Sequence, residues 1–412
     1  MTEGTHTMDQ PLLRHTARSW KVLGILSMMM GFASVSTDLY LPAMPTMSEA
    51  LNASTGSMEL SVSSFLIGFS LSQLFWGPVS DRFGRRAPAA VGVILFIAGS
   101  AGCALSFSAA TLIGFRILQA FGACAGVVIG RAMVRDLFEG PRAAQMLSTL
   151  ITVMAIAPLL GPSIGGQILS LAGWRSIFGV LVAFGCLTLI AIFTLPETLP
   201  PPRRNCEPLT QLFSRYGDLL KYRSVLGYGA VGSFYFAGVF AYIAGSPFAF
   251  ISHHHVPASL YGLIFAMGIL GMMVTNLLNA RLVLRLNANQ LIAIGTVITA
   301  VAGILTAVAA KTDAGGLWGL ILPSFPFVAA NGFIVANCIA GAMAAFPERA
   351  GAVSALIGSF QYGSGFAGAA LVGVFADGSP WPMGWVIGLS GVGGALCMLL
   401  LRSGSNPAAK ES

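Results

Sequence analysis

Residues 77–86 read Gly77-Pro-Val-Ser-Asp81-Arg82-Phe-Gly84-Arg85-Arg86, a short charged loop between two long apolar runs, residues 59–79 and 88–109. Glycine readily adopts the backbone conformations of tight turns, so Gly84 is expected to reverse the chain within a few residues. The turn leaves the Asp81 carboxylate facing a neighbouring helix while the arginines stay at the lipid surface. The stretch therefore predicts two membrane-spanning helices joined on one side of a bilayer.

The composition is that of a protein that crosses a membrane many times. Of the 412 residues, 55% are hydrophobic and 9% are charged, with a mean hydropathy of +0.79; about a quarter of a soluble domain is charged. The net charge of +7 does not indicate nucleic acid, because few charges remain to form a basic face. The six cysteines lack metal-ligand spacing, so we expect inert core residues, no metal and no cofactor.

The apolar runs divide the chain into two similar halves. Twelve runs have roughly the 20-residue length that spans a bilayer, and the first is too long for a signal peptide. We predict an all-α membrane protein with an N-terminal tail (1–19), a six-helix bundle (20–195), a linker (196–223), a second six-helix bundle (224–402) and a C-terminal tail (403–412). The runs are 20–42, 59–79, 88–109, 111–134, 146–170, 174–195, 224–251, 258–280, 289–310, 316–345, 352–375 and 381–402.

Basic residues set the orientation, because Lys and Arg gather in cytoplasmic loops. Only Arg175 and Lys311 fall on one side, so both termini are expected in the cytoplasm of a bacterium whose inner membrane the chain crosses. The opposite side holds Arg14, Arg18, Lys21, Arg82, Arg85, Arg86, Arg135, Arg142, Arg203, Arg204, Arg215, Lys221, Arg223, Arg281, Arg285, Arg349, Arg402 and Lys410.

The linker has an amphipathic pattern. Its apolar residues recur at helical spacing between basic flanks, which predicts a helix on the inner membrane surface. A solvated linker with incidental periodicity is the alternative. The residues are Leu209, Leu212, Phe213, Tyr216, Leu219 and Leu220.

Asp38 and Arg116 are the only acid and base that these spans place well inside the bilayer. Ionisable groups at that depth are costly and usually mark an ion or substrate pathway. With a rise of 1.5 Å per residue, Asp38 lies ~27 Å along the first helix from Trp20, and Arg116 ~8 Å below the outer end of the fourth span. Contact or a shared water is plausible at this depth, although Asp38 could instead cap the end of the first helix near Pro42.

The loop at residues 77–86 resembles the signature loop G-x-x-x-D-R-x-G-R-[KR] of the major facilitator superfamily. The resemblance implies that Asp81 caps the eleventh helix, which begins near residues 347–351, where the helix dipole favours an acid. Gly77, Asp81, Arg82, Gly84 and Arg85 would then form a latch of the outward-facing state. A purely topogenic loop is the plainer alternative.

The fourth and fifth spans carry further motifs of this family. Arg116-Ile-Leu-Gln119-Ala-Phe-Gly122 is similar to R-x-x-Q-G-x-G, with Ala at position 120, and implies a role for Arg116 in proton transfer. Residues 157–166 resemble the antiporter motif G-x-x-x-G-P-x-x-G-G, with Ala157 in place of its first glycine. Its small residues make a flat face and its prolines bend the helix. These residues are Pro158, Gly161, Pro162, Gly165 and Gly166.

The letters Gly161-Pro-Ser163-Ile-Gly165 also match the G-x-S-x-G elbow of hydrolases. That elbow requires a turn between a strand and a helix, with His and Asp partners. In the middle of a helix it does not indicate an enzyme.

Residues 36–43, Ser36-Thr-Asp38-Leu-Tyr40-Leu-Pro42-Ala43, resemble the first helix of the bicyclomycin- and chloramphenicol-resistance (Bcr/CflA) branch of drug:proton antiporters. The segments at 173–178 and 196–199 are similar to that branch as well. The resemblance implies two pseudo-symmetric bundles around a central cavity that opens alternately to each side. We hypothesise that Asp38 binds a proton from outside, releases it inside, and approaches Arg116 when ionised.

The expected function is proton-coupled export of drug-like amphiphilic molecules by a monomer. Alternatives are a narrow exporter of one metabolite, such as an amino acid or a sugar, and a receptor that does not transport. The three adjacent histidines at 253–255 are poorly placed to share one metal ion, so no metal site is expected there. Aromatic and amide side chains would line the drug cavity: Tyr40, Gln73, Gln119, Met154, Phe234, Tyr235, Phe236, Tyr242, Asn276, Asn331, Asn337, Gln361 and Tyr362.

Overall fold

The computed structural model of the chain describes residues 16–138, 145–146, 149–150, 153–204, 216–346 and 349–404. These residues are predominantly helical, and no strand occurs among them. Ten of their helical segments are long and apolar enough to cross a membrane. The shorter apolar helix α7 (Ile156–Ala172) and the Gly- and Ser-rich α15 (Ala350–Val374) complete the twelve predicted spans.

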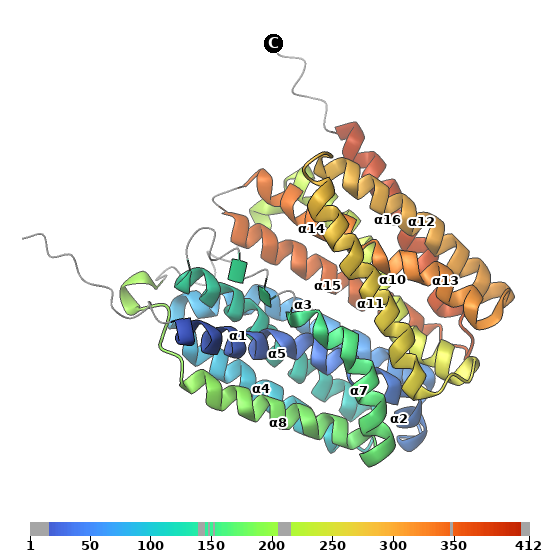
Figure 1. Ribbon diagram of the computed structural model, residues 1–412, viewed down its shortest axis with the longest axis horizontal. Helices are drawn as coiled ribbons and strands as arrows, with labels where there is room; N and C mark the ends of the chain where they lie inside the picture. Colours follow the sequence, from blue (N-terminus) through green and yellow to red (C-terminus); the bar gives the residue numbers. More distant parts are fainter. Residues whose placement is uncertain are drawn as a thin grey trace, which may run out of the picture.

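The two predicted halves are two bundles in space. In Figure 1, α1 to α8 form one bundle and α10 to α16 the other. The first contains α1 (Thr16–Asp38), the short η1 (Leu41–Ala43) and α2 (Met44–Ala50), α3 (Thr55–Phe83), α4 (Arg86–Ala104), α5 (Ala109–Leu137), α7 and α8 (Trp174–Phe193). The second contains α10 (Arg223–Pro247), its π-helical extension η3 (Phe248–His253), α11 (Ala258–Leu282), α12 (Ala288–Thr312), α13 (Gly316–Ala329), α14 (Asn331–Ala344), α15 and α16 (Trp381–Gly404).

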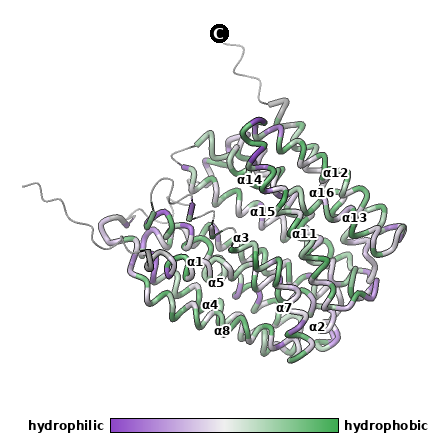
Figure 2. The backbone as a smooth tube through the Cα atoms, in the orientation of Figure 1, coloured by the Kyte–Doolittle hydropathy of each residue, from purple (hydrophilic) through white to green (hydrophobic). Residues whose placement is uncertain are grey.

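The chain enters and leaves the described structure at the same ends of the bundles. We call the side where α1 begins and α16 ends the terminal face, and the opposite side, with η1, α2 and η3, the distal face. Figure 2 shows hydrophobic residues along the helices and hydrophilic residues gathered mainly near their ends, as expected of spans joined by polar loops. Most of the predicted linker helix lies outside the described residues, because residues 205–215 are not described.

Prolines mark the places where the predicted spans are interrupted. α1 ends at Asp38, although the apolar run continues to residue 42, because Pro42 lacks an N–H donor and disfavours helix in the residue before it. The tenth run is likewise two helices, α13 and α14, which meet at Ala330 after Pro323 and Pro326. The first interruption places the Asp38 carboxyl group at a helix end.

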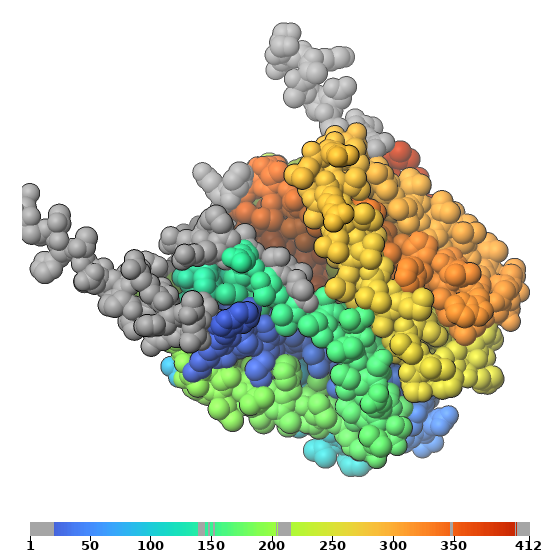
Figure 3. Space-filling view, viewed as in Figure 1, coloured from blue at the N-terminus to red at the C-terminus, as the bar shows by residue number. Residues whose placement is uncertain are grey.

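The two bundles meet along two helix pairs. α3 lies against α15, where the Ser70 hydroxyl donates to the Ser359 carbonyl at 2.8 Å. α7 lies against α11 near the distal face, where a methyl group added to Gly262 would overlap Ser163. In Figure 3 the α7 and α11 surfaces touch toward the distal face, and a hollow separates the bundles toward the terminal face.

Candidate functional site

Arg116 lies on α5 and is fully buried. Its Nη1 donates to the Ser36 carbonyl at 2.9 Å and to Gln119 Oε1 at 2.6 Å. The guanidinium carbon stands 4.3 Å from the Tyr40 ring centroid and 4.5 Å from that of Phe65. Two ring faces and two oxygens therefore surround the buried cation, an arrangement that stabilises a guanidinium.

The Arg116 guanidinium still has unused donors. Nε and Nη2 are buried and make no hydrogen bond within the described structure. Beyond Arg116, Gln119 Nε2 donates to the Ser100 hydroxyl at 2.8 Å, which holds the amide in place. Buried donors without acceptors are costly, so the site is arranged to accept a further oxygen.

Asp38 follows Ser36 by two residues at the end of α1 and does not pair with Arg116. Its side chain is 5% exposed, and its carboxylate makes no hydrogen bond or ion pair with the described residues. Arg116 instead contacts the carbonyl of Ser36, two residues earlier in α1. The sequence predicted that the two groups lie at similar depth and left their contact open; in this state there is none.

The glycines of the predicted antiporter motif lie directly on the Asp38 backbone. A methyl group added to Gly161 would stand 3.0 Å from the Asp38 Cβ. One added to Gly165 would overlap the Leu39 carbonyl, and one added to Gly166 would stand 3.0 Å from the Ala258 carbonyl oxygen of α11. Only Gly165 excludes a methyl group outright, but all three glycines are in close contact, so a shift of α7 changes the surroundings of Asp38 and the contact between bundles together.

The charged loop at residues 77–86 forms an ion-pair cluster at the terminal face. Arg85 Nη1 contacts Asp81 Oδ1 at 2.5 Å, and Arg85 Nε contacts Asp136 Oδ2 at 2.8 Å. The Asp81 side chain is half exposed, and its ion-pair partner in this state is Arg85 rather than the start of α15. Pro347 and Glu348, just before α15, lie outside the described residues, so the latch role of Asp81 stays a prediction.

Glu197, in the linker, caps the helix that follows this loop. It accepts the backbone N–H groups of Arg85 at 2.7 Å, Arg86 at 3.1 Å and Leu199 at 3.0 Å. Burial opposes its charge, but these donors, with the nearby Arg204, hold its pKa below the usual range. Gly84, at φ +88°, makes the turn that the sequence predicted.

An aromatic cluster joins the bundles at mid-height. The Tyr362 ring lies 4.4 Å from Phe69 of α3, 5.6 Å from Phe236 and 6.0 Å from Phe240, both of α10. Beside it, Gln361 has a buried Nε2 without a partner. Three of the predicted cavity residues, Phe236, Gln361 and Tyr362, thus lie at the boundary of the bundles, where a ligand enclosed by both would contact them.

Other predicted cavity residues make contacts within one bundle. In the second bundle, Tyr235 donates to the Val328 carbonyl at 2.8 Å, and Asn337 donates to Asn279 Oδ1 at 2.7 Å. Gln73 of α3 is an exception, because it reaches Gly358 of α15 across the boundary of the bundles. The remaining residues lie as follows: Tyr40 shares a hydrogen bond with Ser61, Tyr242 stacks on Phe265, Phe234 rests on Gly393 of α16, Asn276 is exposed, and Asn331 and Met154 are partly buried.

Glu59 is a buried acid that the sequence did not single out. The predicted second span begins at this residue, which puts its carboxyl group at the end of an apolar run. In the structure α3 begins at Thr55, and Glu59, one turn later, is only 4% exposed with its Oε2 unpartnered. The sequence feature that indicates this earlier helix start is Ser54, an N-cap residue whose side chain accepts a hydrogen bond from Ser57 N.

Comparison with known proteins identifies the family. Residues 25–369 match the model of the Major Facilitator Superfamily, and the chain belongs to that family. It is 33% identical over 388 residues to the uncharacterized MFS-type transporter YdgK of Bacillus subtilis, covering 93% of this chain and 96% of that protein. It is 31% identical to a bicyclomycin resistance protein homolog of Haemophilus influenzae, covering 92% and 95%. It is 26% identical to multidrug resistance protein D of Escherichia coli, covering 94% and 97%.

Solved structures agree with the fold. A D-xylose–proton symporter superimposes with a TM-score of 0.73 at 18% identity, covering 92% of this chain and 97% of that one. The nucleoside transporter NupG gives a TM-score of 0.72 at 15% identity, covering 93% and 98%. The protein is therefore a multi-pass membrane transporter and not an enzyme.

Proposed function

We propose that this transporter exports drug-like amphiphilic molecules across the bacterial inner membrane in exchange for protons. The observation that carries the proposal is the buried, unpaired carboxyl group of Asp38, which lies against Gly161 of α7 and two residues beyond the Ser36 carbonyl that holds Arg116, a cation with unused donors. The names of the bicyclomycin- and multidrug-resistance relatives support drugs as the substrate class.

The terminal face is proposed to be cytoplasmic, with both chain ends inside. Basic residues on the described part of that face, among them Arg82, Arg85 and Arg86, support this orientation. The hollow toward the terminal face would then open to the cytoplasm, so that this state receives substrate from inside. The two bundles, which residues 196–223 connect in sequence, are the proposed rigid units of alternating access.

In this proposal, proton coupling arises because the Asp38 carboxyl group alternates between two environments, one without a cation and one beside Arg116. While Arg116 binds the Ser36 carbonyl, the Asp38 carboxyl group has no cation and is best accommodated as the neutral acid. If α1 or α5 shifts so that Asp38 meets the free Nε and Nη2 of Arg116, the ionised form is stabilised and the proton leaves. Because α7 lies on Asp38, the same movement alters the contact of α7 with α11 and links protonation to the gate.

Asp38→Asn tests this role. In everted vesicles energised by a proton gradient, the variant is expected to lose uphill transport of a fluorescent cationic dye. The matched control is Asp218→Asn, whose exposed carboxylate pairs with Lys221 at 2.9 Å near the terminal face. Uphill transport by Asp38→Asn equal to that of Asp218→Asn would refute the assignment.

A narrow metabolite exporter is the second candidate, and the sugar and nucleoside transporters of like fold leave it open. A substrate panel in proteoliposomes separates the two: several unrelated amphiphiles driving counterflow support drug export, and one metabolite alone supports the narrow exporter. A receptor that does not transport would give binding without any counterflow.

A further inference from the structure

Glu59 lies beside the closest approach of the two bundles at the distal face. One turn before it, a methyl group added to Gly56 would overlap the carbonyl oxygen of Gly373 at the end of α15. The next residue, Leu60, is a near neighbour of Gly373 as well. Glu59 is thus enclosed where α3 and α15 are in backbone contact, and we call this place the distal seam.

Among the residues that the structure describes, none offers the Glu59 carboxylate a compensating charge at the seam. Its Oε2 is buried without a hydrogen-bond donor, and the nearby charge that acts on it is the acidic Asp377, in the loop after α15. Glu49 on the adjoining α2 is exposed, and His253 ends η3. Arg116 of α5 lies over Phe65, farther along α3.

Asp377 itself is fixed in the ionised form. Slight burial opposes its charge, but the Ser379 hydroxyl and backbone N–H donate to it at 2.6 and 2.9 Å and keep its pKa below the usual range. Its negative charge therefore repels an ionised Glu59 across the pH range in which proteins are stable.

We propose that Glu59 is a second proton-binding group of this protein, which takes up a proton from the distal side whenever the distal seam closes. A carboxylate can remain ionised in an open, hydrated seam. Enclosing it without a donor and near Asp377 is strongly unfavourable, whereas enclosing the neutral acid is not. Closure therefore requires Glu59–COO⁻ plus one H⁺ from distal water to give Glu59–COOH, and reopening returns that proton to the same side.

This proton differs from the one assigned to Asp38. It does not cross the membrane, so it adds nothing to the stoichiometry of exchange. It makes the closing step depend on the acidity of the distal compartment. The inference rests on alternating access by this transporter, but not on Asp38 as the coupling carboxyl group.

The test is a distance measurement across the distal face. Spin labels replace Phe107, between α4 and α5, and Trp318, on α13, which are 84% and 62% exposed and belong to different bundles. The protein is cysteine-free apart from the labels and sits in lipid nanodiscs without substrate. Pulsed electron resonance between pH 5.5 and pH 9 then reports the fraction with the distal seam open.

We expect that fraction to rise with pH in the wild type and to be constant and low in Glu59→Gln, the near-isosteric neutral mimic. Glu49→Gln, the same substitution at an exposed acid of α2, should titrate like the wild type. Asp377→Asn should move the opening midpoint to higher pH, because an ionised Glu59 is then repelled less and the seam can stay closed as the pH rises further.

The series is repeated with Asp38→Asn in the background, so that Asp38 cannot supply the response. A pH response that survives Glu59→Gln, or that disappears with Asp38→Asn alone, would overturn the proposal. Failure of the proposed drug export would instead appear in vesicle transport and leave these distances unchanged.

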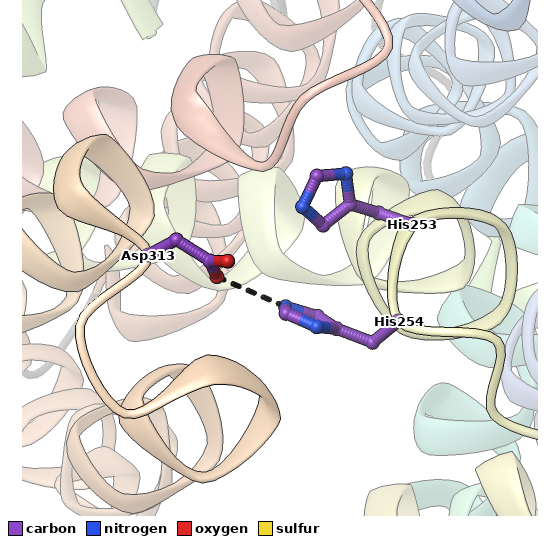
Figure 4. Close-up of side chains that lie close together, drawn as sticks. All are labelled: His253, His254 and Asp313. Atoms are coloured by element: carbon purple, nitrogen blue, oxygen red, sulfur yellow. Dashed lines mark ion pairs between the residues drawn. The ribbon is translucent and has the colours of Figure 1, made fainter.

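A separate observation concerns the histidine loop on the same face. His253 and His254 end η3, and Asp313 lies in the loop between α12 and α13. One donor atom from each lies within 4.8 Å of the others, and His254 Nε2 stands 3.8 Å from Asp313 Oδ1 (Figure 4). Three adjacent histidines alone are poorly placed to share one metal ion. Asp313, far away in the sequence but close in space, adds a carboxylate to two of them.

We propose that His253, His254 and Asp313 bind a divalent transition metal of the zinc class. His254 Nε2 is buried without a hydrogen-bond partner, and 3.8 Å is too long for one to Asp313. Donor atoms of a tetrahedral zinc site are about 3.3 Å apart, so a contraction of at most roughly 1.5 Å would close the site, with water as fourth ligand.

Isothermal titration of the protein without a polyhistidine tag, with zinc chloride as the probe, tests the site. Since even outer-shell partners of a metal contribute about ten- to a hundredfold in affinity, His254→Ala and Asp313→Asn should each weaken binding by at least about tenfold. The control is His255→Asn, because His255 lies outside the cluster at φ +54°, a conformation that Asn tolerates. Equal loss in all three variants, or no loss in Asp313→Asn, would refute the site.

Discussion

Gly165→Ala is expected to disturb the contact of α7 with the end of α1 and to slow transport. A methyl group at this position would overlap the carbonyl oxygen of Leu39 and approach its carbonyl carbon and α-carbon. These are backbone atoms, so no side-chain rotation can make room. α7 must move away from Asp38 for the variant to reach the distal-closed state seen here.

The size of the effect follows from packing. Adding a methyl group to a filled position costs typically about 1–3 kcal/mol, and alanine regains up to about 1 kcal/mol over glycine in helix propensity. If the strain falls only on the state in which α7 rests on α1, a net 1–2 kcal/mol shifts the closed-to-open ratio by about 5- to 30-fold.

The assay is the labelled pair on the distal face, combined with the rate of substrate efflux from proteoliposomes. Gly161→Ala should be milder, because its methyl group would stand 3.0 Å from the Asp38 Cβ and a small shift relieves it. Gly114→Ala on α5, with no atom within 4 Å of the added methyl group, is the matched control. If Gly165→Ala shows the distances and rate of Gly114→Ala, α7 does not act through this contact.

Three further predictions concern the remaining charges and turns. Arg116→Lys should abolish proton-driven efflux, because an ammonium group cannot hold the Ser36 carbonyl and lie flat between two rings; Arg131→Lys, exposed on α5, should stay active in the same vesicle assay. Glu197→Gln should lower stability by about 0.5–2 kcal/mol through the lost helix cap. Because the folded-state pKa of Glu197 is depressed, that stability is present at neutral pH and is lost as the pH falls below about 4. The melting temperatures of wild type and variant should therefore converge in acid, and a constant gap would contradict the cap. Gly84→Ala should destabilise by about 1–2 kcal/mol at φ +88°, measured by thermal unfolding against Gly179→Ala, which meets no atom.

The fold was predictable because spanning helices have a simple physical requirement. About 20 apolar residues are needed to cross the bilayer, and the counts along the chain located all twelve spans and the division into two bundles. The positions at which helices are interrupted were harder to predict from the sequence. Hydropathy continues past Asp38, and only the prolines that follow explain why α1 ends at that residue.

The sequence could single out candidate residues, whose roles stay predictions, but not the contacts that they make. Motif spacing singled out Asp38, Arg116 and the glycines of α7, and the structure brings them together. Spacing could not show that Arg116 binds the Ser36 carbonyl instead of Asp38, since that depends on how α5 is placed against α1. Glu59 was missed because a hydropathy window marks the border of a span only to within a turn, and burial under α15 is a tertiary property.

Proton release on substrate binding tests the central claim most directly. Purified protein in weakly buffered detergent solution is mixed with a transported drug, and a pH-indicator dye records protons released. The account predicts release by the wild type and by Asp218→Asn, and none by Asp38→Asn, with drug binding retained in all three. Release that is undiminished in Asp38→Asn would show that the proton is carried elsewhere and would contradict the account.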